Sequence, residues 1–155
     1  QERNRRGGTE NVAFIVAFGQ AAKDAYSDQG ASFEERMNSI ESYRRRIEDA
    51  FSLSAYGAII NGKEARRVAN TVNIGFANVD ALRLSLLLES RGIYVSNGSA
   101  CNTVNPQKSH VLEAMKSPAY KNGAIRISLS EYTQGRDIDY FIDNLRQSIK
   151  NIKGE

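Results

Sequence analysis

The chain has 155 residues, of which 41% are hydrophobic and 25% are charged, and these values predict one folded domain rather than a disordered chain. Its 21 basic and 18 acidic residues are interleaved, so the net charge of +3 predicts no nucleic-acid partner. The single cysteine excludes an internal disulfide and a multi-cysteine zinc site, and no apolar run predicts a membrane span or a secretory signal. We therefore expect no membrane partner, no metal and a cytoplasmic location, where thiols stay reduced.

Two helices are predicted in the first third of the chain. Apolar residues recur at helical spacing over residues 10–26, with Thr9 as a suitable N-cap. Residues 12–18 are apolar almost without a break, which is typical of a helix covered on all sides. Ser32 and Glu35 form a capping box for a second helix over residues 33–51. We expect the solvated outer face of this second helix to carry Arg44, Arg45, Arg46 and Glu48.

Short strands and further helices alternate in the remainder. Strands are predicted at about residues 56–60, 72–76, 93–95 and 124–129. Helices are predicted at 79–90, capped by Asn78, at 109–115, and from a cap at Thr133 to Ile152. In the last strand, Ile125, Ile127 and Leu129 share one face, and Arg126 and Ser128 share the other. The fold class is therefore α/β, with a small sheet and helices packed on it.

Cys101 lies in a loop at residues 96–107 that is built from small and polar residues. Most free cysteines are small buried hydrophobes, and this remains one interpretation. However, a loop that follows a strand is a common position for reactive groups. No lysine or arginine adjoins Cys101 in the sequence, so a thiolate needs help from the fold or from a substrate.

Three other positions are candidates for binding. Arg126 is either an exposed edge residue or a planar fork that holds a carboxylate. The basic, glycine-containing residues 3–9 lead into a helix start, where backbone N–H groups and the Thr9 hydroxyl favour an anion. His110 is the only histidine and cannot make a metal site alone; a surface role at a helix start is the simpler interpretation.

These residues together resemble the cysteine desulfurases, pyridoxal-phosphate enzymes of the class-V aminotransferase family. Residues 1–11 are similar to that family's Gln-Glu-x-x-x-Arg-x-Gly-Thr-Glu-Asn segment, and residues 96–101 are similar to its Ser-Ser-Gly-Ser-Ala-Cys loop. Matches at 109–112, 124–128 and 137–140 follow in the family's order and spacing. The resemblance covers nearly the whole chain. Within the family, it is to the group of enzymes that supplies sulfur for iron–sulfur clusters.

The resemblance implies only the C-terminal portion of such an enzyme. The chain begins within a motif and without methionine, and the family's cofactor-binding lysine lies upstream of the matching segment. We expect residues 1–27 to be the end of the large cofactor-binding domain with its linking helix. Residues 28–155 would be the small domain of a fold-type I pyridoxal-phosphate enzyme, and they carry the cysteine loop.

The resemblance also implies a role for each candidate residue. Cys101 would be the catalytic nucleophile that takes sulfur from L-cysteine as a persulfide, and Arg126 would bind the substrate carboxylate. Thr9, with Arg6 as a support for the same region, would bind the pyridoxal phosphate of the neighbouring subunit, which implies a homodimer. A sulfur-acceptor or scaffold protein would receive the persulfide sulfur.

Two alternatives stay open from the sequence. The chain could be a stand-alone domain without catalysis, a persulfide carrier or a partner-binding module. It could also belong to another class-V aminotransferase that acts on a different amino acid, although plain transamination has no use for a nucleophilic cysteine.

Overall fold

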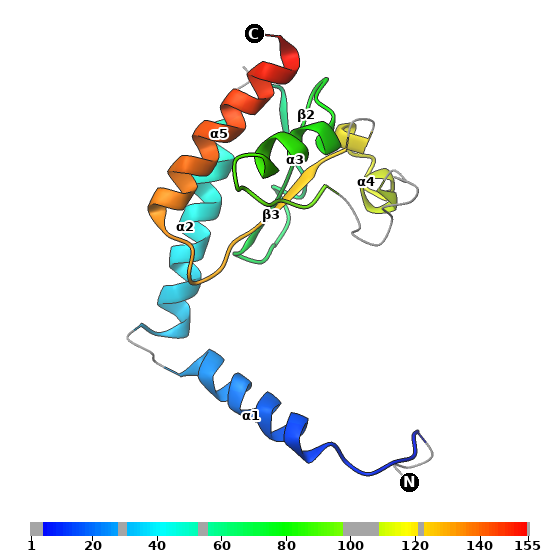
Figure 1. Ribbon diagram of the computed structural model, residues 1–155, viewed down its shortest axis with the longest axis vertical. Helices are drawn as coiled ribbons and strands as arrows, with labels where there is room; N and C mark the ends of the chain where they lie inside the picture. The colour runs from blue at the N-terminus through cyan, green and yellow to red at the C-terminus, as the bar shows by residue number, and fades with distance from the viewer. Residues whose placement is uncertain (1–4, 28–30, 53–55, 98–108, 121–122, 155) are drawn as a thin grey trace. The chain divides into compact units, whose positions relative to one another are not determined.

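A computed structural model describes residues 5–27, 31–52, 56–97, 109–120 and 123–154 (Figure 1). The chain divides into two compact units, residues 1–36 and residues 37–155. The elements are α1 (Val12–Tyr26), α2 (Phe33–Ser52), β1 (Ala58–Ile60), β2 (Thr71–Phe76), α3 (Ala81–Glu89), α4 (His110–Ala114), the 3-10 helix η3 (Pro118–Tyr120), β3 (Ile125–Ser128) and α5 (Gly135–Lys153). Among the described helices, none combines the length and the apolar character needed to cross a bilayer.

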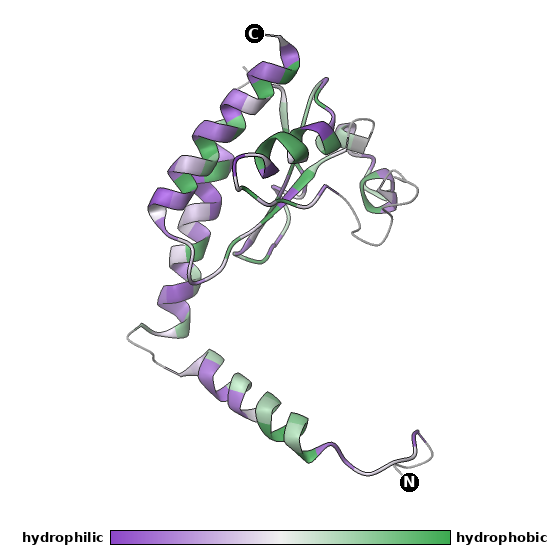
Figure 2. Ribbon diagram, in the orientation of Figure 1, coloured by the Kyte–Doolittle hydropathy of each residue, from purple (hydrophilic) through white to green (hydrophobic). Residues whose placement is uncertain are grey.

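Helix α1 forms where the apolar spacing predicts it, but its cap differs from the prediction. The side chain of Asn11, not Thr9, accepts from the backbone N–H of Phe14, at 3.2 Å. Thr9 is wrong as the cap because it lies two residues too far from the first turn. No residue of α1 is buried within the chain, and the apolar side chains of its first turns are exposed. Figure 2 shows these turns coloured as hydrophobic.

Helix α2 begins with the predicted capping box. The backbone N–H of Ser32 donates to Glu35 Oε2 at 2.8 Å, and the backbone N–H of Glu35 donates to Ser32 Oγ at 3.2 Å. These hydrogen bonds from Ser32 stabilise the ionised form of the Glu35 side chain, so they hold the pKa of Glu35 below its ordinary value.

A three-stranded antiparallel sheet in the order β1-β2-β3 forms the centre of the second unit. Alternation in β2 and β3 sends one set of side chains to the helices: Val72, Ile74, Phe76, Ile125, Ile127 and Leu129. These pack with buried residues of α2, α3 and α5, and α2 and α5 run along the same side of the sheet in Figure 1. The predicted strand at 93–95 is wrong. Residues 93–95 form no strand, and the next residue, Ser96, pairs only as an isolated bridge to Arg126.

Two helices have caps one or two residues beyond the predicted ones. Asp80, not Asn78, caps α3 by accepting from the backbone N–H of Arg83 at 2.8 Å, because Asn78 occupies a left-handed turn position with φ of 60°. Gln134, not Thr133, precedes α5, because the Thr133 hydroxyl accepts instead from the backbone N–H of Ser130. The apolar stripe of α5 is buried as predicted.

The face of the sheet opposite these helices is partly covered by the segment that contains η3. Ala119 packs there with Leu112, Ala124 and Ile59. Gly75 of β2 allows this approach: a Cβ built on it would lie 2.6 Å from Ala119 Cβ and 3.0 Å from the carbonyl oxygen of Gly123. The absence of a side chain at residue 75 therefore fixes how closely η3 lies on the sheet.

The prediction that Arg44 and Glu48 are solvated is wrong. The apolar stripe of α2 has a gap between Ile40 and Ile47, and Arg44 fills it, so Arg44 and Glu48 are only 8% and 5% exposed. Glu48 Oε1 lies 3.2 Å from Arg44 Nη1 and 2.9 Å from Arg67 Nη1. The buried Glu48 carboxylate thus forms ion pairs with two arginines and links the segment before β2 to α2.

We predict that Glu48→Gln lowers the free energy of unfolding by about 3 kcal/mol, because Arg67 then has no ion-pair partner among the described residues and the buried Arg44 keeps only the more exposed Glu41. Urea denaturation of the chain measures the loss. Glu41→Gln is the matched control: its side chain is 33% exposed and also binds Arg44, so water screens its removal and the loss should be much smaller. Equal losses in the two variants would contradict a buried role for Glu48.

We further predict that Gly75→Ala lowers the free energy of unfolding by about 1–3 kcal/mol, because the new methyl group overlaps Ala119 and must push η3 off the sheet. Thermal unfolding followed by circular dichroism is the measurement. Gly19→Ala in α1 is the control, since nothing lies within 4 Å of its added Cβ, and alanine there should be neutral or stabilising. A Gly75→Ala protein as stable as the parent would refute the close packing.

Candidate functional site

Arg126 lies on the exposed face of β3, as the alternation predicts. Its neighbours Ile125 and Ile127 are buried, whereas Arg126 itself is exposed. Within the part of the chain that the structure describes, the guanidinium has no hydrogen bond or ion pair. An unpaired guanidinium has a rigid fork of donors that suits a planar anion such as a carboxylate.

The backbone of Arg126 determines which side chain lies beside it. Its N–H donates to the carbonyl of Ser96 at 2.6 Å, and its carbonyl accepts from the Ser96 N–H at 3.1 Å. Both groups therefore point away from β2, which makes Arg126 and its register partner Asn73 a non-hydrogen-bonded pair. In such pairs the Cα atoms are about 4.5 Å apart and the side chains are closest. Asn73 is thus the nearest cross-strand neighbour of Arg126 on this face.

Asn73 is the end of a chain of hydrogen bonds that sequence reasoning missed. The backbone N–H of Ala119 donates to Ser117 Oγ at 3.2 Å, and Ser117 Oγ lies 2.5 Å from Asn61 Oδ1. Asn61 Nδ2 in turn donates to Asn73 Oδ1 at 2.6 Å. These side chains are half-buried and come from three separate segments. The sole sequence signal for any of them is that Asn73 is polar at an alternating position of β2.

Residues 98–108, which include Cys101, lie outside the described residues, so the prediction of a reactive thiol stays untested. Asn97 is the last described residue before residues 98–108. Its side-chain amide donates to Ser85 Oγ at 3.2 Å. Ser96, the residue before it, is the one that pairs with Arg126. The segment that contains Cys101 therefore continues from a backbone position hydrogen-bonded to Arg126.

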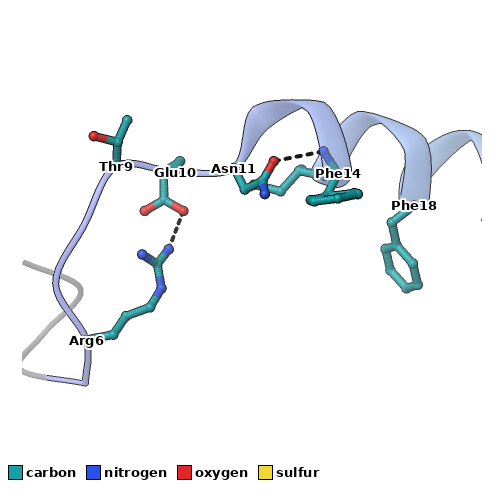
Figure 3. A pocket seen from close by; sticks show the side chains of 7 residues that line it. Arg6, Thr9, Glu10, Asn11, Phe14 and Phe18 are labelled. Carbon is teal, nitrogen blue, oxygen red and sulfur yellow. Dashed lines mark hydrogen bonds and ion pairs between the residues drawn. The ribbon is translucent and has the colours of Figure 1, made fainter.

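Thr9 belongs to the first unit and Arg126 to the second, so each is described within its own unit. Thr9 is exposed and, with Arg6, Glu10, Asn11 and apolar side chains of α1, lines an open groove of about 420 Å³. Figure 3 shows the Thr9 side chain pointing away from the ion pair between Arg6 and Glu10, which measures 2.5 Å. That pair neutralises the carboxylate that would otherwise repel an anion. The Thr9 hydroxyl remains nearby, and a Cβ built on Gly7 or Gly8 would meet nothing within 4 Å.

His110 is exposed at the first position of α4, where the Ser109 side chain caps the helix. The surface interpretation of this residue therefore holds. In the described ranges, no three His, Cys, Asp or Glu side chains gather in a way that could hold a metal ion.

Comparison with known proteins places these residues in context. Residues 1–141 match the family model described as Aminotransferase class-V. The chain is 34% identical over 154 residues to cysteine desulfurase IscS of Dictyoglomus turgidum, and 38% identical over 155 residues to cysteine desulfurase NifS of Azotobacter vinelandii. These alignments cover 99% of this chain but only 38% and 37% of the two relatives.

Solved structures give the same result for the fold. A NifS-like protein superimposes with a TM-score of 0.74 at 30% identity, over 97% of this chain and 37% of that one. A NifS-like protein from Rickettsia africae gives a TM-score of 0.73 at 28% identity, over 100% of this chain and 38% of that one. The chain thus spans little more than a third of the proteins that it is similar to.

Proposed function

Since the chain belongs to the class-V aminotransferase family, we propose that it is the C-terminal part of a cysteine desulfurase that converts L-cysteine to alanine and passes on the sulfur. One structural observation carries this proposal. Arg126 is exposed, its guanidinium has no partner among the described residues, and its backbone is hydrogen-bonded to Ser96, from which the segment with Cys101 continues. The proposed carboxylate-binding group is thus bridged to the start of the segment that contains the thiol.

Arg126 is proposed to bind the substrate carboxylate. Its guanidinium offers two parallel N–H donors, and burial of Ile125 and Ile127 on the opposite face fixes the strand that carries it. Because the other described residues leave this group without a counter-charge, it can take one from the substrate. Binding by a planar fork orients the amino acid as well as holding it.

Pyridoxal phosphate is the proposed cofactor, and the residues around Thr9 fit its phosphate group. The Thr9 hydroxyl is a donor, the lack of side chains at Gly7 and Gly8 leaves room beside it, and the Glu10 carboxylate is already paired with Arg6. Thr9 would hold the cofactor of a neighbouring subunit, so we propose a homodimer. When bound, this cofactor supplies an electron sink that makes the Cβ–S bond of cysteine labile.

Cys101 is proposed as the nucleophile in the sulfur transfer. Its thiolate forms an S–S bond to the substrate sulfur while the Cβ–S bond breaks. The electron pair of that bond stays with carbon, which takes a proton and becomes the methyl group of alanine. Carbon is thereby reduced and sulfur oxidised, so no external oxidant is needed, and Cys101 becomes a persulfide.

We propose that the persulfide sulfur passes to an acceptor or scaffold protein for iron–sulfur cluster assembly in the cytoplasm. Residues 1–27 would belong to the large domain and residues 28–155 to the small one. The exposed apolar turns of α1 support this division, because such a surface needs cover from other parts of a larger protein.

In the full-length protein, Cys101→Ser should abolish sulfur transfer but leave cysteine binding intact, because a hydroxyl is a poor nucleophile toward sulfur. Arg126→Ala should raise KM for cysteine far more than it lowers kcat, and Arg126→Lys should restore binding only partly. Alanine release measures turnover, and a cysteine titration followed by the cofactor absorbance measures binding. If Cys101→Ser loses binding while Arg126→Ala keeps it, the two assigned roles are wrong.

The chain of 155 residues alone should not turn over cysteine, because the family's cofactor-binding lysine lies upstream of the segment that it matches. Incubation with pyridoxal phosphate and cysteine, followed by assays for alanine and sulfide, gives the test. The full-length protein at the same concentration is the positive control. Release of both products by the chain alone, in proportion to the added cofactor, would contradict this expectation.

A further inference from the structure

The hydrogen-bond chain behind Arg126 runs in one direction. Ser117 Oγ accepts from a backbone N–H, so its own hydroxyl hydrogen is available to donate to Asn61 Oδ1. That bond fixes the amide of Asn61 with its Nδ2 toward Asn73, where it can only donate. Asn73 must then present Oδ1 to Asn61. The orientation of both amides therefore follows from one backbone N–H.

Because the hydrogen bonds run in this direction, the Nδ2 group of Asn73 is the last group of the hydrogen-bond chain. It lies on the same face of the sheet as Arg126. With Oδ1 turned toward β1, the two hydrogens of Nδ2 are directed away from β1. In the described part of the chain, Nδ2 has no partner, and its nearest cross-strand neighbour is Arg126. Two donor groups, the Asn73 amide nitrogen and the Arg126 guanidinium, are thus cross-strand neighbours, and neither can satisfy the other.

We infer that Asn73 is a second ligand of the substrate carboxylate, donating its Nδ2–H to one oxygen while the Arg126 guanidinium binds the same group. Asn61 and Ser117 are positioning residues that hold the Asn73 amide in the donating orientation. This inference rests on the proposed function, which supplies an amino-acid substrate. A guanidinium alone would bind many anions, whereas a guanidinium with a fixed amide donor selects a group with two adjacent oxygens.

A purely structural interpretation of Asn73 makes a different prediction. If Asn73 only ties β2 to β1, any residue that accepts from Asn61 Nδ2 would replace it. Asn73→Asp keeps that acceptor and exchanges the outward donor for an oxygen anion. A structural role therefore predicts normal cysteine binding in Asn73→Asp, and a ligand role predicts a severe defect.

Steady-state kinetics of the full-length protein provides the test. We expect Asn73→Ala to raise KM for cysteine about tenfold, with kcat within about twofold, as for loss of one hydrogen bond to a charged group. Asn73→Asp should raise KM further. Ser128→Ala, on the same face of β3 and equally exposed, is the matched control and should change neither constant. An unchanged KM in Asn73→Asp, which preserves the tie to Asn61, would overturn the inference.

A double-mutant cycle tests the positioning role. Ser117→Ala should raise KM about threefold in the parent protein, because Asn61 can then reverse its amide. In the Asn73→Ala background the same substitution should have no effect on KM, since no donor remains to be oriented. An equal effect of Ser117→Ala in both backgrounds would show that Ser117 acts elsewhere and would overturn the positioning role.

A measurement without turnover separates this inference from the proposed function. Acetate added to the 15N-labelled chain should shift the side-chain NH2 resonances of Asn73, whereas acetamide at equal concentration should not, and Arg126→Ala should remove the shift. If the wild-type full-length protein fails to convert cysteine, the proposed function is wrong, and this titration still decides the carboxylate site. Shifts of Arg126 without any at Asn73 would overturn the inference.

Discussion

The alternation of side chains along β2 and β3 is the constraint on which both the core and the candidate site depend. Successive residues of a strand point to opposite faces, so burial of Val72, Ile74 and Ile127 against the helices forces Asn73 and Arg126 to the other face. A register slip of one residue would exchange the two sets. The hydrophobic core and the proposed carboxylate-binding face therefore depend on the same register, and neither can be changed independently of the other.

Some features that depend on local sequence were predictable. The strand alternation around Arg126 and the capping box between Ser32 and Glu35 involve residues within a few positions of each other, and the structure has both. The burial of Arg44 was not predictable from its own helix, because its partner Glu48 is also held by Arg67, which comes from a separate segment. A charged residue in a gap of an apolar stripe can be solvated or paired, and only the tertiary fold decides.

The candidate site likewise contains residues that local sequence indicates and residues that only the tertiary fold brings together. Arg126 could be identified as a candidate because a lone cation on the polar face of an amphipathic strand stands out in the sequence. Asn61, Asn73 and Ser117 could not be identified, since amides and hydroxyls are common and the significance of these three arises from contacts across 56 residues of chain. The positive φ of Asn78 likewise moved the cap of α3 to Asp80, a displacement that propensity alone does not reveal.

The chemical character of the hydrogen-bond chain has a consequence for proton equilibria. Its members are two amides, a hydroxyl and a backbone N–H, none of which gains or loses a proton in the range where proteins stay folded. The Asn73 amide therefore offers the same donor at acidic and at alkaline pH. On the proposed function, any bell-shaped dependence of cysteine turnover on pH would report the ionisation of groups outside this hydrogen-bond chain, and the chain would contribute nothing to it.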